Sequence, residues 1–333
     1  MGTVNPSPST LSLTDLFAPV EEHLALVDTW ITEALSGEHP RLDPLLVHLR
    51  KFRGKRIRAA QILLIAQASD SISEHHIPLA GIVELIHAAT LVHDDLLDEA
   101  SQRRRLDCVH VEWGSHSAVL LGDWIYAKAF EHCTHLPGEE ASLRLARATR
   151  RVCAGEIFQN LTRKDFDLSE EDYLLQVDGK TGALFEEGCR LAAAFADASK
   201  EIQDACALHG KLAGRAFQMA DDLLDLVGDE AVVGKSLGTD WARGKMTLPL
   251  IRLRGQLSEA ACADLRRDFG SGEGRQTLFQ ENYTGALQYA LESSEEEINS
   301  CLDQAAEALA ALPPSPARHS LISLTYFLGT RNQ

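Results

Sequence analysis

Two identical acidic pentapeptides are the feature of this 333-residue chain best suited to chemistry. The sequence Asp-Asp-Leu-Leu-Asp occurs at residues 94–98 and again at 221–225, each time inside an apolar stretch with helical spacing. On a helix, residues four apart share a face, so the first and third aspartate of each copy lie together and the second is close by. The six carboxylates are Asp94, Asp95, Asp98, Asp221, Asp222 and Asp225.

Carboxylates grouped in this way repel one another, and burying them unpaired costs several kcal/mol each, roughly. Mg²⁺ removes that cost, because it binds one or two carboxylates and completes its shell with water and substrate phosphates. A single such run is often only a solvated helix face. Two copies within apolar helices instead predict acidic patches on opposite walls of one cavity, with a polyphosphate held between them.

Several basic segments could bind the same polyphosphate. One runs from Arg53 to Arg58, a second is Arg103-Arg104-Arg105, and a third is Lys180-Thr181-Gly182. A glycine-containing stretch from Gly234 to Pro249 carries Lys235 and Lys245 just after the second pentapeptide. Guanidinium and ammonium groups near glycines suit phosphate, and a flexible loop beside a metal site suits a lid. Each segment could instead neutralise the nearby aspartates or be an ordinary charged part of the surface.

Composition excludes several classes of function. The net charge is −17 and the sequence pI is about 5.2, so nucleic acid is an unsuitable partner. Seven scattered cysteines without a CxxC motif predict reduced thiols, and the first residues do not resemble a signal peptide. We therefore expect a cytoplasmic protein without a transmembrane segment, although transient membrane contact during release of an oily product is compatible with the sequence.

The chain reads as helical almost throughout, with no convincing strand. We predict a short disordered lead at residues 1–10 and one all-α domain at 11–333, with about ten helices around a central cavity. Ser169, followed by three acidic residues, has the composition of a helix start.

These residues together resemble the trans-isoprenyl diphosphate synthases of the polyprenyl synthetase family, and in particular octaprenyl diphosphate synthases. The resemblance covers about residues 45–250. It rests on Glu84-Leu85-Ile86-His87 before the first pentapeptide, Phe217-Gln218 before the second, the Arg53–Ala59 basic segment, and the Gly234–Pro249 stretch. Three positions depart from the family pattern: Arg53 and Arg105 replace glycines, and Ala59 replaces a proline.

The resemblance implies an isoprenoid synthase helical bundle, a homodimer, and condensation of isopentenyl diphosphate with an allylic diphosphate. It implies three Mg²⁺ ions bound with the allylic diphosphate on Asp94, Asp98 and Asp221, with Asp95, Asp222 and Asp225 in support. Arg103, Lys180 and Lys245 would neutralise the charge of the allylic diphosphate, and Lys235 would help to close the loop. Thr181 and Gln218 would line the path of the carbocation. Lys55, Arg58, His87 and Arg104 would bind isopentenyl diphosphate.

The length of the product should depend on the size of the side chains about one helical turn before Asp94. Ala89 and Thr90 stand there, where short-chain members of the family carry aromatic residues. We therefore expect a long-chain all-trans product, heptaprenyl to nonaprenyl. The alternatives are a short-chain farnesyl or geranylgeranyl diphosphate synthase, a class I terpene cyclase, and a regulatory synthase subunit. A passive acidic cation-binding protein is a further alternative, but it would not need the basic residues.

Overall fold

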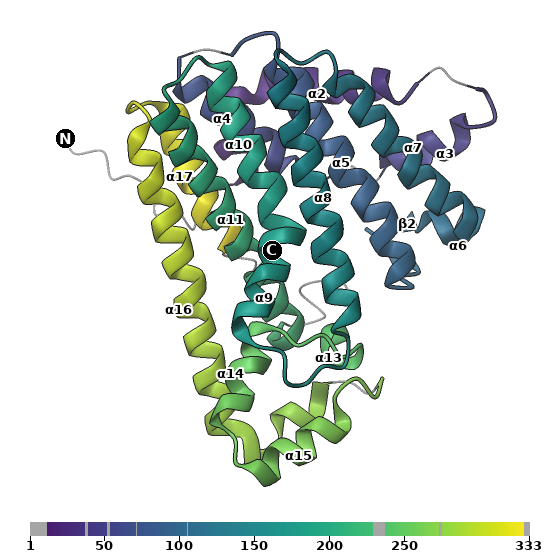
Figure 1. The fold of residues 1–333 in the computed structure, drawn as a ribbon, viewed down its shortest axis with the longest axis vertical. Helices are drawn as coiled ribbons and strands as arrows, with labels where there is room; N and C mark the ends of the chain where they lie inside the picture. Colours follow the sequence, from purple (N-terminus) through teal and green to yellow (C-terminus); the bar gives the residue numbers. More distant parts are fainter. Residues whose placement is uncertain are drawn as a thin grey trace.

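The computed structural model describes residues 12–36, 39–51, 54–70, 72–104, 106–228, 237–272 and 275–329. The predicted lead at residues 1–10 lies outside this part of the chain. The described residues form an all-α bundle, as expected (Figure 1). Its longer α-helices are α2 (Glu21–Ala34), α4 (Ile57–Ala68), α5 (His76–Leu97), α7 (Ser115–Cys133), α8 (Glu139–Leu161), α10 (Ala183–Phe195), α11 (Lys200–Val227), α15 (Glu259–Asp268), α16 (Thr284–Ala308) and α17 (Pro316–Gly329).

Shorter helices connect these long ones. They are α1 (Leu13–Phe17), α3 (Asp43–Lys51), α6 (Val109–Trp113), α9 (Glu170–Val177), α13 (Thr239–Ala242) and α14 (Leu248–Gln256), together with a π-helical segment, η3 (Asp178–Gly182), and the 3-10 turns η2 (Ala18–Val20), η4 (Arg275–Phe279), η5 (Glu281–Tyr283) and η6 (Leu309–Ala311). Ser169 caps α9 as predicted, since its hydroxyl accepts a hydrogen bond of 3.0 Å from the Asp172 amide.

The expectation of no strand was wrong in one place. Two short strands, β1 (Gln102–Arg103) and β2 (Leu106–Asp107), pair antiparallel directly after the first acidic pentapeptide. Strands of two residues are too short to show an alternating pattern in the sequence, which is why the apolar periodicity missed them.

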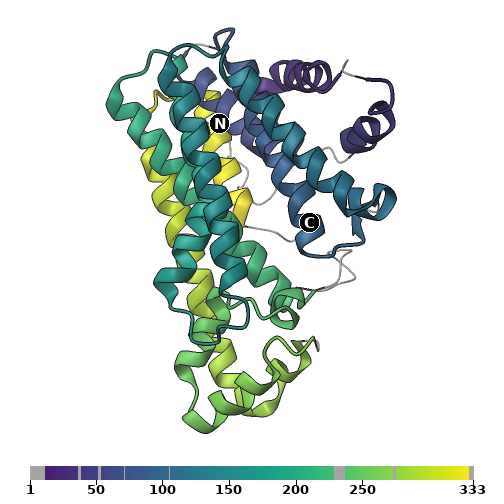
Figure 2. The same ribbon diagram turned by 45° about the vertical axis from the view of Figure 1, so that its right-hand side comes forward.

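The bundle has two apolar cores. One lies among α2, α4, α5, α7 and α10, and the other among α9, α11, α14 and α16. Helices α2 and α3 lie across one end of the bundle, and α14 and α15 lie at the opposite end (Figures 1 and 2). The two acidic pentapeptides are at the C-terminal ends of α5 and α11, so each core carries one of them.

Helix α5 is buried on nearly every side. By length and composition it could cross a membrane, but 61% of its apolar window is buried inside the protein, which accounts for its apolar sequence. Gly81 lets α2 approach closely, because a Cβ at this position would come within 2.1 Å of the Trp30 ring. The apolar packing of α5 therefore fixes the direction in which its terminal aspartates point.

Candidate active site

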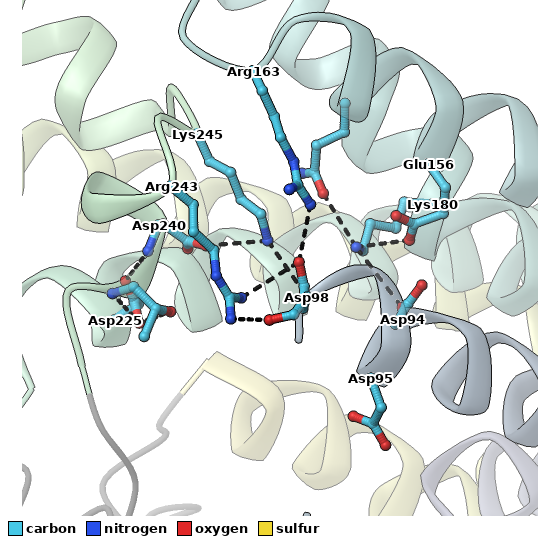
Figure 3. A network of polar contacts seen from close by, with 12 residues as sticks. Asp94, Asp95, Asp98, Glu156, Arg163, Lys180, Asp225, Asp240, Arg243 and Lys245 are labelled. Atoms are coloured by element: carbon cyan, nitrogen blue, oxygen red, sulfur yellow. Dashed lines mark hydrogen bonds and ion pairs between the residues drawn. The ribbon is translucent and has the colours of Figure 1, made fainter. Parts of the chain in front are cut away.

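The first acidic cluster lies on the last turn of α5. Asp94 and Asp98 share one face of the helix, as predicted, and both point toward the ends of α8 and η3 (Figure 3). Lys180 lies 3.9 Å from an Asp94 carboxylate oxygen and 2.7 Å from Glu156, and it donates to the Gln159 side chain. Lys180 therefore joins the first cluster to α8.

Three cations surround Asp98. Its carboxylate oxygens lie 3.1 Å from Arg163, 3.4 Å from Arg243 and 3.7 Å from Lys245 (Figure 3). Arg243 also donates to the Asp98 backbone carbonyl. Lys245 extends in turn to Asp240, at 3.3 Å. The segment after α13 thus crosses to the first acidic helix and approaches it from the side of the second.

Lys180 and Thr181 stand on the π-helical segment η3 rather than on a regular helix. A π-helical turn is rare and frequently occurs at a functional site. Two contacts hold this one in place. Arg215 of α11 donates two hydrogen bonds to Asp178, and a Cβ at Gly155 of α8 would lie only 2.5 Å from the Lys180 backbone nitrogen.

The second acidic cluster faces inward more than the sequence suggested. Asp222 accepts hydrogen bonds from the Tyr173 hydroxyl at 2.6 Å and from the Gln218 amide at 2.9 Å. The Gln218 carbonyl oxygen accepts in turn from the Thr181 hydroxyl at 2.8 Å. Two of the residues expected along the carbocation path, Thr181 and Gln218, are therefore in direct contact.

Asp225 caps the short helix α13. Its carboxylate accepts from the Thr239 amide and hydroxyl and from the Asp240 amide, at 2.9–3.3 Å. Asp221 lies half-buried one turn earlier on α11. Lys235 is outside the described residues, but Asp225 fixes the chain just after it. The second pentapeptide is thus tied to the segment that carries Lys245.

Burial and neighbouring charges perturb these groups. Burial raises the pKa of Asp94 to about 7, and the Lys180 charge offsets this only in part. Burial also raises the pKa of Asp222 to about 7, and the Asp240 charge adds to the effect. Burial acts on Asp98 in the same direction, but Lys245 and Arg243 outweigh it and hold the pKa of Asp98 below its usual value. The protein therefore compensates the negative charge of Asp98 better than that of Asp94 or Asp222.

Two of the residues predicted to bind isopentenyl diphosphate, Arg58 and Arg104, lie close to a third, His87. Burial, followed by the charges of Arg58, Arg103, Arg104 and Arg56, holds the pKa of His87 well below its usual value, so it is neutral at pH 7. Four guanidinium groups from the start of α4 and from the hairpin therefore lie close to one imidazole. Such a concentration of positive charge suits an anion.

Individual members of this basic cluster have protein partners. Arg103 binds the buried Asp95 through two nitrogen atoms, at 2.7–2.9 Å. Arg58 lies over the Phe185 ring at 4.4 Å, and Lys55 over the Phe327 ring at 5.7 Å. An added Cβ at Gly54 would lie 3.7 Å from Arg104.

The Ala59 departure has a physical consequence. Its backbone N–H donates to the buried Glu84 carboxylate at 3.2 Å, a bond that proline cannot make. Glu84 also binds Arg56 at 3.1 Å. The departures at Arg53 and Arg105 lie outside the described residues.

The two residues expected to set product length occupy different environments. Thr90 is half-buried on the face of α5 that carries Asp94, and its hydroxyl donates to the His87 carbonyl. Ala89 has an exposed fraction of 0%. Because successive helical residues are turned by about 100°, Ala89 points well away from Asp94, whereas Thr90 lies one turn below it.

Divalent cations fit the chemistry of this site. Asp94 and Asp98 offer two hard oxygen ligands on one helix face, and the carboxylate of Asp94 is under-compensated. Among the residues that the structure describes, no three His, Cys, Asp or Glu side chains converge into a complete metal site. Mg²⁺ typically binds one or two protein carboxylates and completes its shell with water and substrate phosphates.

Sequence reasoning missed six residues of this network: Glu156, Gln159 and Arg163 on or just after α8, Tyr173 on α9, and Asp240 and Arg243 in and just after α13. The first three were detectable in principle. They stand at spacings of three and four, so they form one polar stripe on a helix. Tyr173 gave no such signal, because a single tyrosine in a short helix is normally interpreted as a core residue.

Comparisons with known proteins found one matching family and a number of similar proteins. Residues 39–283 match the polyprenyl synthetase family profile. The octaprenyl diphosphate synthase of Escherichia coli (strain K12) is 32% identical over 316 residues, which cover 94% of this chain and 97% of the relative.

Solved structures of similar proteins have the same fold. A decaprenyl diphosphate synthase from Rhodobacter capsulatus superposes with a TM-score of 0.88 and 31% identity, covering 97% of this chain and 100% of that one. A polyprenyl synthase from Caulobacter crescentus CB15, complexed with calcium and isoprenyl diphosphate, superposes with a TM-score of 0.87 and 31% identity, covering 97% and 98%. The all-helical isoprenoid synthase fold is thereby confirmed.

Proposed function

This chain belongs to the polyprenyl synthetase family and is a prenyltransferase, and on this premise we propose that it makes a long-chain, octaprenyl-like all-trans polyprenyl diphosphate. The substrates would be isopentenyl diphosphate and an allylic diphosphate. The observation that carries the proposal is the convergence on Asp98 of Arg163, from the end of α8, and of Arg243 and Lys245, from the segment after α13. Opposed carboxylates and cations are what a metal-bound diphosphate requires.

The allylic diphosphate would lie between the two acidic helices. Asp94, Asp98 and Asp221 would hold Mg²⁺, which when bound neutralises the diphosphate and makes it a better leaving group. We propose three ions, as in the family. Lys180 and Lys245 would contact the diphosphate oxygens, and Lys235 would reach it from the loop. Arg103 would add positive charge while Asp95 holds its orientation.

Isopentenyl diphosphate would occupy the basic cluster around His87, bound by Lys55, Arg58 and Arg104. A neutral His87 can donate one hydrogen bond to the phosphate without adding charge. The ion pair between Arg56 and Glu84 would keep this cluster rigid.

In the reaction, the C–O bond of the allylic substrate breaks and the diphosphate leaves with the electron pair. The double bond of isopentenyl diphosphate then forms a C–C bond to the allylic cation, and loss of one proton gives the longer allylic diphosphate. Thr181 and Gln218 would present oxygen atoms toward the cation. The buried walls would exclude water, which would otherwise quench the cation.

A long-chain product is favoured by the small residues below Asp94. Thr90 lines that side of α5 and Ala89 is buried behind it. Incubation with Mg²⁺, isopentenyl diphosphate and farnesyl diphosphate should give a ladder of dephosphorylated products that ends well beyond geranylgeranyl on mass spectrometry. A stop at geranylgeranyl would refute the length. An absence of condensation with any allylic primer would refute the synthase.

We also propose a homodimer through the outer faces of α7 and α8. Large apolar side chains are exposed near the ends of α5, α7 and α8: Leu97, Val119, Leu120, Ile157 and Leu161. Leu97 and α8 line a common pocket, and the Val119 carbonyl accepts from His93 of α5, which brings the three helix ends together. Exposed apolar surface of this kind commonly marks an interface.

Light scattering tests the dimer. Leu120→Glu should give a monomer, whereas Leu208→Glu, at an exposed apolar position on α11, should leave the dimer intact. A dimeric Leu120→Glu variant would exclude this face. A cytoplasmic location, with transient membrane contact on product release, completes the proposal.

A further inference from the structure

Four side chains form one continuous hydrogen-bonded chain beneath the second acidic cluster. It runs from Thr181 on η3, through Gln218 and Asp222 on α11, to Tyr173 on α9, with distances of 2.8, 2.9 and 2.6 Å. Tyr173 is 2% exposed, Thr181 5% and Asp222 8%. Water therefore has little access to the chain, and each polar group depends on its protein partner.

The direction of every hydrogen bond in this chain follows from Asp222. When Asp222 is ionised, its carboxylate can only accept, so Tyr173 donates its hydroxyl proton to it and Gln218 presents its NH₂ group. The Gln218 carbonyl oxygen then faces Thr181, and the Thr181 hydroxyl must donate to it. Both carboxylate oxygens of Asp222 are engaged within the protein. The lone pairs of the Thr181 oxygen are left for a partner other than Gln218.

We propose that Tyr173 is a positioning residue for the condensation, acting through Asp222 and Gln218 to fix the orientation of the Thr181 hydroxyl toward the carbocation. This inference rests on the proposed function. Asp222 then has a different role from Asp221, because it orients the Gln218 amide and the Thr181 hydroxyl instead of holding Mg²⁺. The negative charge of Asp222 polarises the Gln218 amide and the Thr181 hydroxyl, which makes the Thr181 oxygen more electron-rich. A dipole fixed before the charge develops stabilises it without reorganisation.

The position of Tyr173 suits this task. Its helix, α9, leads directly into η3, so the residue that anchors Asp222 and the residue whose hydroxyl is oriented belong to one continuous segment. Asp178 binds that segment to α11 through Arg215, at 2.6 and 2.8 Å. Both ends of the chain are therefore rigid relative to Gln218 and Asp222.

Steady-state kinetics of Tyr173→Phe test the inference. Because the interaction acts on the developing cation, we expect kcat to fall about tenfold, while the KM of both diphosphates and the Mg²⁺ requirement stay within about twofold of wild type. The matched control is Tyr326→Phe, which removes a hydroxyl that donates to Asp303 at 2.9 Å in an exposed hydrogen bond between α17 and α16. It should leave kcat unchanged.

A double-mutant cycle tests the route of the effect. If Tyr173 acts through Thr181, the combination of Tyr173→Phe with Thr181→Val should be no slower than Thr181→Val alone. Additive losses would overturn the inference. So would an unchanged kcat in Tyr173→Phe, or a loss that appears as a raised Mg²⁺ requirement.

A second variant guards against a folding defect in Tyr173→Phe. Asp222→Asn keeps an acceptor for Tyr173 but turns a donor toward Gln218, which must then flip and reverse the Thr181 hydroxyl. We expect the same fall in kcat, with the thermal midpoint close to wild type. A fully active Asp222→Asn would overturn the inference. A wild-type enzyme that fails to condense would overturn the proposed function and this inference together.

Discussion

Arg163, just after the end of α8, lies 3.1 Å from a carboxylate oxygen of Asp98 on α5. The pair joins two walls of the site, and about a third of each side chain or less is exposed. A cation of the protein therefore neutralises a carboxylate that we assign to Mg²⁺. Metal binding at Asp98 must compete with this ion pair.

Replacing Arg163 with glutamine should lower the Mg²⁺ concentration that gives half-maximal activity. A partly exposed ion pair contributes about 1 kcal/mol, so the change should be about fivefold or less. Titration of activity against free Mg²⁺ measures it. Arg266→Gln, which breaks an exposed pair with Asp167, is the control and should have no effect. A higher Mg²⁺ requirement in Arg163→Gln would contradict the competition.

Gly155 should be intolerant of any side chain. A Cβ there would lie 2.5 Å from the Lys180 backbone nitrogen, so Gly155→Ala must displace η3. We expect a loss of about 1–3 kcal/mol in the free energy of unfolding, as for overpacked cores, and reduced kcat. Urea unfolding measures the first. Gly255→Ala, within α14 and facing open space, should instead gain up to about 1 kcal/mol. Equal stability of the two variants would refute the close contact.

The metal-free protein should lose stability as pH rises through neutrality. The pKa of Asp94 is raised from 3.8 to about 7 by burial, so the folded state binds this proton more tightly than the unfolded state. The resulting stabilisation is complete below the unfolded pKa and is lost as pH rises through about 7. Thermal midpoints measured in EDTA between about pH 5.5 and 8 should fall.

Asp94→Asn should flatten part of that dependence. Asp222 contributes with the same sign, because burial also raises its pKa to about 7, so some slope remains in the variant. Addition of Mg²⁺ with inorganic diphosphate should remove the fall in the wild type. A thermal midpoint that rises with pH over this range would contradict the raised pKa of Asp94.

Bulk at positions 89 and 90 should have different consequences. Thr90→Phe places an aromatic ring one turn below Asp94, so the longest product should become shorter at near-normal stability. Ala89 is 0% exposed, so Ala89→Phe should shorten the product only by displacing neighbours, with a loss of stability of about 1–3 kcal/mol. Mass spectrometry of the products and urea unfolding separate the two effects. An unchanged product in both variants would refute the role of this level of α5.

The sequence by itself determined the all-α fold and the principal chemistry. Helical periodicity and the i, i+4 spacing of Asp94 and Asp98 are local properties, so they could be read from the chain without knowing its neighbours. The same holds for the Ser169 cap, which depends on residues three apart. The family motifs added the expectation that two distant pentapeptides serve one substrate.

Only the tertiary structure decided which group faces which. Asp98 meets Arg163, Arg243 and Lys245, and Asp222 turns inward to Tyr173, although the two pentapeptides are identical in sequence. The difference arises because each pentapeptide ends a helix packed in a different core, and packing sets the direction of each carboxylate. The π-helical turn at Lys180 likewise depends on close contact with Gly155, which lies 25 residues earlier in the chain. Local sequence fixes helices and their faces, whereas long-range packing fixes the partners of those faces.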